Sequence, residues 1–362
     1  LLVGRERSKN YQALAELPGD PFFDRVLIGE YSPGSPFKIL TGLIGLQEEV
    51  IDTHTSFPCS HGFYYARGAF MKCHDAGSWN LHPAIAKSCN TYFAQTYKRI
   101  IDKYKNPKLG MDAWYNHLRS FGLGQFLGYD LPIGRKGQIP NSEYYDRWYP
   151  KGGWKGTTTI SNAIGQGEIT VTPIQLANVM CAVANQGYYY TPHIIKSIQD
   201  DKIDKNFVEK KTTTIDKQHF FPVIEGLAEV YKSGTASRLQ IPDINICGKT
   251  GTVENFIKVD GQKKQLKDHS VFLAFAPKED PKIVIAVFIE NGGFGATIAG
   301  PIASLMIEKY LKGIITRTDL EKRLLDSTLE SEYILKDQVE AEKRAKAKLE
   351  AELKAKQKRI NG

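Results

Sequence analysis

A serine and a lysine that could act as a nucleophile and its base stand near the start of the chain. Ser35 follows a Pro-Gly pair and precedes Pro36, a combination that forms tight turns and begins helices. Apolar positions over residues 37–51 recur at helical spacing and predict a helix. Lys38 then lies one turn after Ser35 on the same face, where an amine can take the hydroxyl proton. Taken alone, this spacing is more often a capping serine beside a solvated lysine.

Two further motifs carry polar side chains that acyl transfer needs. The only K-T-G in the chain comprises Lys249, Thr250 and Gly251, followed by Thr252. An S-x-N sequence is less specific, because it occurs at residues 8–10, 78–80 and 88–90. We select Ser88 and Asn90 because they fall within a predicted helix at residues 82–104, which can hold a side chain rigidly, whereas the other two lie in loop sequence. The ordered set of three motifs is much more specific than any one of them.

The elements that must position these motifs are mixed in type. Helical periodicity predicts helices at residues 37–51, 82–104, 110–121, 172–187, 218–232 and 301–312. Strands are expected at residues 188–198 and, in the last third, around 244–256, 269–277 and 282–291. Residues 52–82 and 123–158 are expected to be loops. This order predicts one α+β domain over residues 1–315, followed by a charged helical or disordered tail at 316–362 with no assigned function.

Composition narrows the class of protein. The 362 residues are 41% hydrophobic and 11% aromatic, which is ordinary for a folded globular chain and speaks against disorder. The net charge of +8 lies partly in the C-terminal segment and gives little support to nucleic-acid binding. No apolar run approaches the roughly 20 residues that span a bilayer. Because the chain opens without an initiator methionine, we expect an N-terminally truncated fragment.

The three motifs, in this order, resemble those of the penicillin-recognising serine transferases and hydrolases. The stretches GQGEITVTPIQLA at 165–177, ICGKTGT at 246–252 and FIENGGFGATIAGPIASLMIEKYL at 288–311 resemble the class B penicillin-binding proteins, in particular the penicillin-binding protein 2 subfamily in its Bacteroidetes-like form. The resemblance covers about residues 1–315. It implies a penicillin-binding/β-lactamase-like transpeptidase fold, with an antiparallel sheet packed against helices and an all-helical lobe.

The resemblance also implies an activity and a cellular setting. It implies a peptidoglycan D,D-transpeptidase that cross-links stem peptides for cell elongation and rod shape and is inhibited by β-lactams. The full-length protein would be anchored in the inner membrane with its catalytic domain in the periplasm. A membrane glycan polymerase and elongation-complex proteins would be its partners. No organic cofactor and no nucleic acid are expected.

Five side chains are assigned catalytic roles by this resemblance and by their chemistry. Ser35 would attack the D-Ala–D-Ala amide. Lys38 would be its base and must therefore be neutral, so burial and the nearby charge of Lys249 should lower its pKa. Ser88 would relay a proton to the leaving amine, and Asn90 would hold Lys38 and the substrate amide.

The K-T-G-T stretch is assigned to substrate binding. A strand containing Thr250, Gly251 and Thr252 would pair with the extended substrate backbone. The two threonines would bind the terminal carboxylate beside Lys249. The backbone N–H groups of Ser35 and Thr252 would form the oxyanion hole, which is worth about 3–4 kcal/mol in comparable sites.

A cluster of cysteines and histidines at residues 52–90 predicts a structural zinc ion. Thiolate and imidazole ligands suit tetrahedral zinc, and the resemblance implies that the middle residue of S-x-N is one ligand. The expected ligand set is Cys59, Cys73, His74 and Cys89, with His61 or His82 as replacements for His74. The alternative is that these are reduced thiols in an ordinary core.

Other functions stay open or are excluded. A D,D-carboxypeptidase or β-lactamase would use the same residues with water as the acceptor, and a β-lactam sensor would acylate without turnover. A zinc module that binds nucleic acid has no support from the catalytic motifs. A phosphate-binding loop at G-K-T is rejected, because the required glycine is replaced by Asp243.

Overall fold

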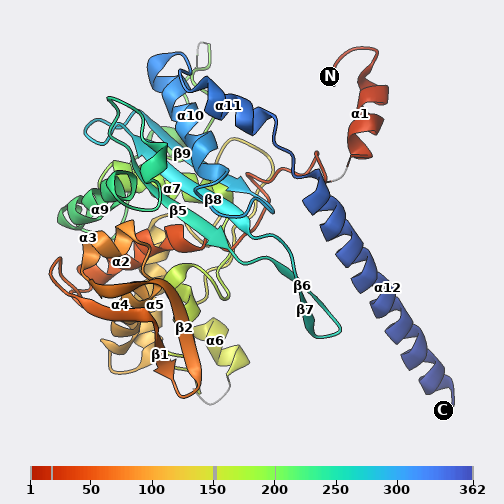
Figure 1. Cartoon of the computed structure of the whole chain (residues 1–362), viewed down its shortest axis with the longest axis horizontal. Coiled ribbons are helices and arrows are strands. Elements are labelled where there is room, and N and C mark those ends of the chain that lie inside the picture. Colours follow the sequence, from red (N-terminus) through yellow and green to blue (C-terminus); the bar gives the residue numbers. More distant parts are fainter. Residues whose placement is uncertain (1, 18, 150–152, 200, 361–362) are drawn as a thin grey trace.

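The computed structural model describes residues 2–17, 19–149, 153–199 and 201–360 (Figure 1). The helices are α1 Arg7–Ala15, α2 Lys38–Gln47, α3 Leu81–Ala86, α4 Asn90–Asp102, α5 Pro107–Ser120, α6 Ser142–Trp148, α7 Pro173–Ala184, α8 Lys205–Val208, α9 Phe220–Lys232, α10 Ala299–Lys312, α11 Thr318–Leu325 and α12 Glu330–Ile360. The strands are β1 Phe57–Ala66, β2 Ala69–Trp79, β3 Tyr188–Tyr189, β4 Lys211–Thr212, β5 Cys247–Val253, β6 Phe256–Val259, β7 Gln262–Gln265, β8 His269–Ala276 and β9 Ile283–Ile289. Residue 1 and residues 361–362, the outer ends of the two predicted segments, lie outside the described residues.

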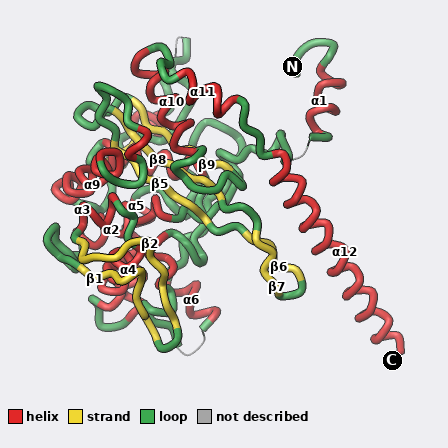
Figure 2. The backbone as a smooth tube through the Cα atoms, viewed as in Figure 1, coloured by secondary structure: helices red, strands yellow, loops and turns green. Residues whose placement is uncertain are grey.

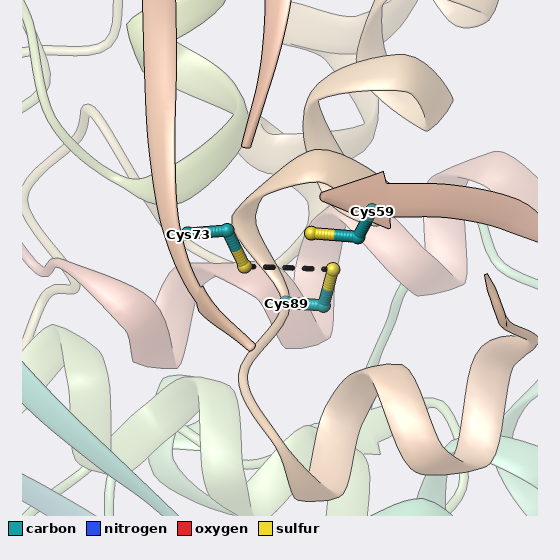
Figure 3. A group of neighbouring side chains, drawn as sticks. All are labelled: Cys59, Cys73 and Cys89. Atoms are coloured by element: carbon teal, nitrogen blue, oxygen red, sulfur yellow. Dashed lines mark hydrogen bonds between the residues drawn. The ribbon is translucent and has the colours of Figure 1, made fainter. Parts of the chain in front are cut away.

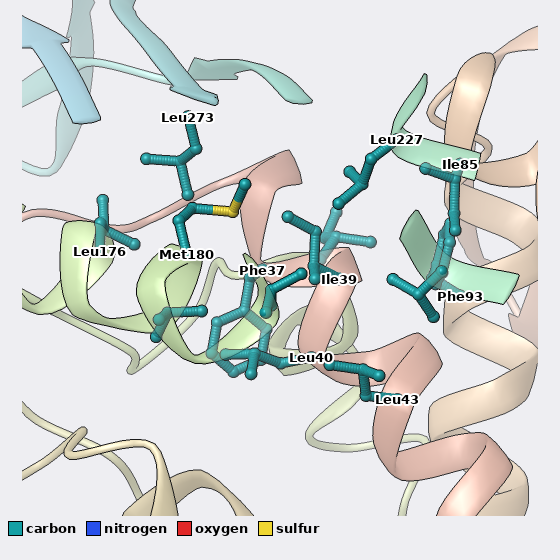
Figure 4. Packing of buried hydrophobic residues seen from close by; sticks show 14 of the residues in the cluster. Phe37, Ile39, Leu40, Leu43, Ile85, Phe93, Leu176, Met180, Leu227 and Leu273 are labelled. Atoms are coloured by element: carbon teal, nitrogen blue, oxygen red, sulfur yellow. The ribbon is translucent and has the colours of Figure 1, made fainter. Parts of the chain in front are cut away.

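One half of the molecule contains an antiparallel sheet with the strand order β5-β8-β9. Every residue of the central strand β8 except His269 is buried, as expected for a strand covered on both faces. Phe272 lies under Gly300 of α10, where a Cβ would meet its ring at 3.2 Å. The neighbouring Leu273 points instead toward Met180 of α7 (Figure 4). Because successive side chains of a strand point to opposite faces, α10 and α7 cover opposite faces of the sheet.

Helix α2, which begins at the predicted lysine base, is the central helix of the other half. All of its residues except Gln47 are buried, so it is surrounded by protein. Figure 4 shows Ile39, Leu40 and Leu43 of α2 among side chains from α4, α7 and α9. Gly45 allows α4 to approach closely, since a Cβ at this position would stand 2.5 Å from Thr96 Cγ2. The start of α2 is therefore held firmly between the sheet and the helical lobe.

The segment at residues 52–82, which was predicted to be loops, contains the hairpin β1–β2 and the first residues of α3. The two strands pair antiparallel, with register shifts between Ser60 and Gly62 and between Tyr64 and Ala66. These irregularities break the two-residue alternation of buried and exposed side chains by which a strand is identified in a sequence. The hairpin was missed for this reason.

Three other predictions are corrected. The segment at residues 123–158, which was expected to be loops, contains helix α6. The helix expected at residues 82–104 is interrupted between α3 and α4, where Ser88 has a φ of +58°. The strand expected at residues 188–198 is limited to β3, the first two of those residues, and pairs with β4. The remaining predicted helices correspond to α2, α5, α7, α9 and α10, and the β-rich stretches contain β5, β8 and β9. The predicted α+β fold class is confirmed.

The C-terminal segment is helical over α11 and α12. Figure 2 shows α12 running away from the body of the molecule, next to the hairpin β6–β7. In the described part of the chain, none of the helices has the length and hydropathy needed to span a bilayer.

Candidate active site

The predicted nucleophile Ser35 begins a short 3-10 turn, Ser35–Phe37, that leads directly into α2. The preceding Gly34 has a φ of +61°, and its N–H donates to the carbonyl oxygen of Gly165 over 2.9 Å. A Cβ at Gly165 would stand 2.5 Å from the Gly34 carbonyl oxygen, so the close approach depends on glycine there. Gly165 lies in the 165–177 stretch that carries the family resemblance, but it was not predicted to be a site residue. The turn leaves the Ser35 side chain half-buried rather than enclosed.

Lys38 connects the predicted catalytic residues. Its Nζ lies 3.0 Å from Ser35 Oγ, 3.0 Å from Ser88 Oγ and 2.6 Å from Asn90 Oδ1. The side chain is buried, with 1% of the residue exposed, and burial lowers its pKa to about 8. The structure therefore brings the S-x-x-K and S-x-N motifs into direct contact, as predicted. Of the three S-x-N sequences, the one at residues 88–90 is the one whose serine and asparagine side chains contact Lys38 in the described part of the chain.

The interruption between α3 and α4 presents Ser88 to the lysine. With its backbone in the left-handed region, Ser88 directs both its carbonyl oxygen, 2.7 Å from Lys38 Nζ, and its hydroxyl toward the amine. Asn90 donates from Nδ2 to the backbone oxygen of Lys72 over 2.7 Å. Strand β2 thus supports the base through Asn90. Sequence reasoning missed the contribution of Lys72, because it did not predict the strand that contains it.

Strand β5 places Lys249 in the interior of the protein, near Lys38. Lys249 is 0% exposed and donates to the carbonyl oxygen of Thr250 over 3.1 Å. Its pKa is held well below the usual value, first by burial and then by the charge of Lys38. We expected the charge of Lys249 to lower the pKa of Lys38. Instead, burial lowers the pKa of Lys38, and the charge of Lys38 lowers the pKa of Lys249.

The remaining residues of K-T-G-T follow Lys249 on strand β5. The Thr250 hydroxyl shares a hydrogen bond of 2.6 Å with the hydroxyl of Thr235, and Thr252 Oγ1 accepts from the N–H of Gly295 over 3.4 Å. Gly251 faces the turn that holds the nucleophile. Thr235 was missed because it lies in an irregular segment after α9 with no motif of its own.

Three of the four predicted metal ligands lie together (Figure 3). The Sγ atoms of Cys59, Cys73 and Cys89 all lie within 4.8 Å of one another, and all three residues are buried. The Sγ atoms of Cys73 and Cys89 share a hydrogen bond of 3.7 Å, and the backbone N–H of Asn90 donates to Cys73 Sγ over 3.3 Å. These hydrogen bonds lower the pKa of Cys73 to about 4, whereas the neighbouring thiolate and burial raise the pKa of Cys89.

The fourth predicted ligand does not join this cluster. His74 follows Cys73 on β2 and is exposed, because adjacent residues of a strand point to opposite faces. His61 pairs through Nδ1 with the backbone oxygen of His74, and His82 lines a separate cavity of about 650 Å³ with Leu46 and Phe221. Among the described residues, only the three cysteines form the group. His74 is therefore removed from the expected ligand set.

A family model and several known proteins are similar to this chain. Residues 2–308 match the family model described as penicillin binding protein transpeptidase domain. Peptidoglycan D,D-transpeptidase MrdA of Acinetobacter baumannii is 32% identical over 323 residues, which is 83% of this chain and 45% of that protein. The chain thus spans about half the length of the curated relatives it matches.

Two solved structures show the same fold. The structure of Pseudomonas aeruginosa PBP2 in complex with WCK 5153 superimposes with a TM-score of 0.72 at 26% identity, over 86% of this chain and 68% of that one. A chain from a peptidoglycan synthase complex, described for the coordination of polymerization and crosslinking, gives a TM-score of 0.73 at 26% identity, over 86% and 52%.

Proposed function

The chain belongs to the penicillin-binding protein transpeptidase domain family, and we propose that it is a serine D,D-transpeptidase that cross-links peptidoglycan stem peptides and is acylated by β-lactams. The observation that carries this proposal is the distance of 3.0 Å between Ser35 Oγ and the buried Lys38 Nζ. A serine hydroxyl is unreactive without a base, and this amine is placed to take its proton. The activity for cell elongation and rod shape belongs to the same proposal.

Acylation follows from these positions. Neutral Lys38 takes the proton of Ser35, whose oxygen attacks the carbonyl carbon of the penultimate D-Ala. The N–H groups of Ser35 and Thr252 stabilise the oxyanion. The proton passes through Ser88, whose Oγ lies 3.0 Å from Lys38 Nζ, to the nitrogen of the terminal D-Ala. That amine leaves with its new proton, and Ser35 holds the acyl group as an ester.

The second step reverses the first with a different amine. An amine from a neighbouring stem peptide attacks the ester carbon, its proton returns through the same residues to Ser35 Oγ, and the cross-link forms. Thr250, Gly251 and Thr252 bind the donor peptide, with its carboxylate beside Lys249. Water in place of the amine would make the enzyme a D,D-carboxypeptidase or β-lactamase, and no second step at all would make it a sensor.

Two measurements test this proposal. Intact mass spectrometry after exposure to penicillin should show one added acyl group in the parent chain and none in Ser35→Ala. A stem-peptide donor should then give cross-linked product only when an amine acceptor is present. Release of D-Ala at the same rate with and without the acceptor would support hydrolysis, and acylation without peptide turnover would support a sensor.

We also propose that Cys59, Cys73 and Cys89 bind a structural zinc ion. Three buried sulfur atoms within 4.8 Å of one another can supply three of the four ligands of a tetrahedral zinc ion, and the lowered pKa of Cys73 favours its thiolate form. A zinc ion there would pin Cys89, and with it Ser88 and Asn90 on either side. It would shape the site without taking part in the reaction.

The setting of the whole protein is proposed by analogy with its relatives. We place the catalytic domain in the periplasm, anchored to the inner membrane by a part of the protein outside this chain. A membrane glycan polymerase is the expected partner, because one structural relative comes from a peptidoglycan synthase complex that joins polymerization to crosslinking. Co-purification of the full-length protein with such a polymerase tests this proposal.

A further inference from the structure

Helix α12, which lies beyond the residues matched by the family model, is bound to the domain by an apolar contact. Val339 is buried against Val259 and Leu266 of the β6–β7 region, with Ile257 packed beside them. Ion pairs flank this cluster, from Lys264 to Glu342 over 3.1 Å and from Lys346 to Asp260 over 2.7 Å. Because these pairs are exposed, the apolar cluster supplies most of the attachment.

The hairpin β6–β7 continues directly from the strand that carries K-T-G-T (Figure 1). Val253, the last residue of β5, is buried and packs on Gly34, where a Cβ would stand 2.8 Å from Val253 Cγ2. Asn255 closes the base of the hairpin: its carbonyl oxygen accepts from the N–H of Leu266 over 2.9 Å. A continuous line of contacts therefore runs from α12 through the hairpin to the residue before Ser35.

A second line of contacts reaches the same segment. Tyr333 of α12 donates from its hydroxyl to Glu290, at the end of β9, over 3.1 Å. The Glu290 carboxylate also accepts from the hydroxyl of Tyr31 over 2.9 Å and from Arg25 over 3.0 Å. Tyr31 exchanges backbone hydrogen bonds with Val171 shortly before the nucleophile turn. Glu290 thus links α12 to the backbone that leads into Ser35.

We infer that α12 is a positioning element for acylation, with Val339 and Tyr333 as its positioning residues. The helix holds the hairpin β6–β7 and the Glu290 side chain, and these hold β5 and the Gly34–Ser35 turn at the spacing that the reaction requires. Neither residue touches the substrate. This inference rests on the proposed acylation of Ser35, and it gives a role to a segment for which the sequence alone suggested none.

The test uses the full chain with Val339→Asp, which puts a charge into the apolar cluster. Acylation by a fluorescent penicillin, measured over a range of concentrations, separates the maximum rate from the half-saturating concentration. Because changes along such contact lines alter coupling modestly, we expect the maximum rate to fall by roughly 3- to 30-fold. Amide hydrogen exchange of residues 256–266 should rise in the same variant. Val339→Ile should restore both values.

Two other variants complete the test. Leu353→Asp lies on α12 beyond the contacts with the hairpin, at a residue that is 53% exposed, and should leave acylation unchanged. Tyr333→Phe removes only the hydroxyl bonded to Glu290 and should slow acylation about threefold. If near-ultraviolet circular dichroism shows that Val339→Asp does not fold, the rate of Tyr333→Phe decides whether α12 positions the site. Faster hairpin exchange with a parental acylation rate would overturn the inference. Failure of penicillin to label Ser35 in the parent would instead overturn the proposed function.

Discussion

Gly251 of strand β5 lies against Pro36, so closely that a Cβ at position 251 would stand 2.5 Å from Pro36 Cδ. This contact joins the strand proposed to bind substrate to the turn that carries the nucleophile. A proline ring cannot rotate away from an added atom, so the spacing between the two elements depends on the absence of a side chain at residue 251. The G of K-T-G is thus a packing requirement as well as part of the motif.

Gly251→Ala is therefore expected to separate β5 from the Ser35 turn. Overpacking of this kind lowers the free energy of unfolding by about 1–3 kcal/mol, and acylation by penicillin should slow at the same time. Thermal unfolding and labelling kinetics measure the two effects. Gly153→Ala is the matched control, since a Cβ there would meet no atom of the described residues within 4 Å. Equal behaviour of the two variants would contradict the role given to this contact.

The burial of Lys38 predicts how acylation depends on pH. Only the neutral amine can take the Ser35 proton, and its pKa is about 8. The acylation rate should therefore rise with pH up to about 8 and level off above it. Lys38→Arg cannot lose its proton in this range and should slow acylation by roughly 100- to 10,000-fold. Lys72→Arg, a change at an exposed residue whose backbone oxygen alone contacts the site, should have no effect.

The same group links pH to stability. Since the pKa of Lys38 is lowered from 10.5 to about 8 in the folded chain, the unfolded chain binds more protons between these two values. The free energy of unfolding should therefore gain a contribution from Lys38 as pH rises from 8 toward 10.5. Urea titrations of the parent and of Lys38→Met at several pH values measure this contribution, which should be missing in the variant.

Asn90→Asp tests the support that Asn90 gives to the base. The change removes the donor to Lys72 and puts a carboxylate where Asn90 Oδ1 lies 2.6 Å from Lys38 Nζ. A negative charge there raises the pKa of Lys38, so the rise of the acylation rate should move to higher pH. At neutral pH we expect a loss of roughly 100-fold. Asn80→Asp, in an S-x-N sequence that does not reach Lys38, should keep the parental profile.

The zinc proposal predicts about one metal ion per chain in protein purified without chelator, measured by elemental mass spectrometry. Cys73→Ser should lose the ion and unfold at a lower temperature. Cys181→Ser removes a thiol of α7 that lies outside the cluster and should keep the metal. A metal-free parent whose stability is insensitive to chelators would rule out the ion.

The parts of this site that depend on residues close together in the chain could be predicted from the sequence. The spacing of Ser35 and Lys38 depends on one helical turn, and the K-T-G-T stretch depends on β-strand preference, so both followed from periodicities that neighbouring residues impose. The α+β class followed in the same way from the order of helical and β-rich segments. The three motifs in one order were enough to indicate acyl transfer.

The sequence favoured the S-x-N of residues 88–90 but placed it within one continuous helix. The tertiary structure instead brings Ser88 to Lys38 through a left-handed residue between two helices packed against α2. It also decided that His74 turns away from the three cysteines, since the face of a strand depends on a register that bulges had concealed in the sequence. A lowered pKa of Lys38 was expected from its proposed role, but its cause is burial, which depends on all the elements packed around the side chain. Local patterns predict elements, whereas contacts between residues far apart in the chain depend on how those elements pack.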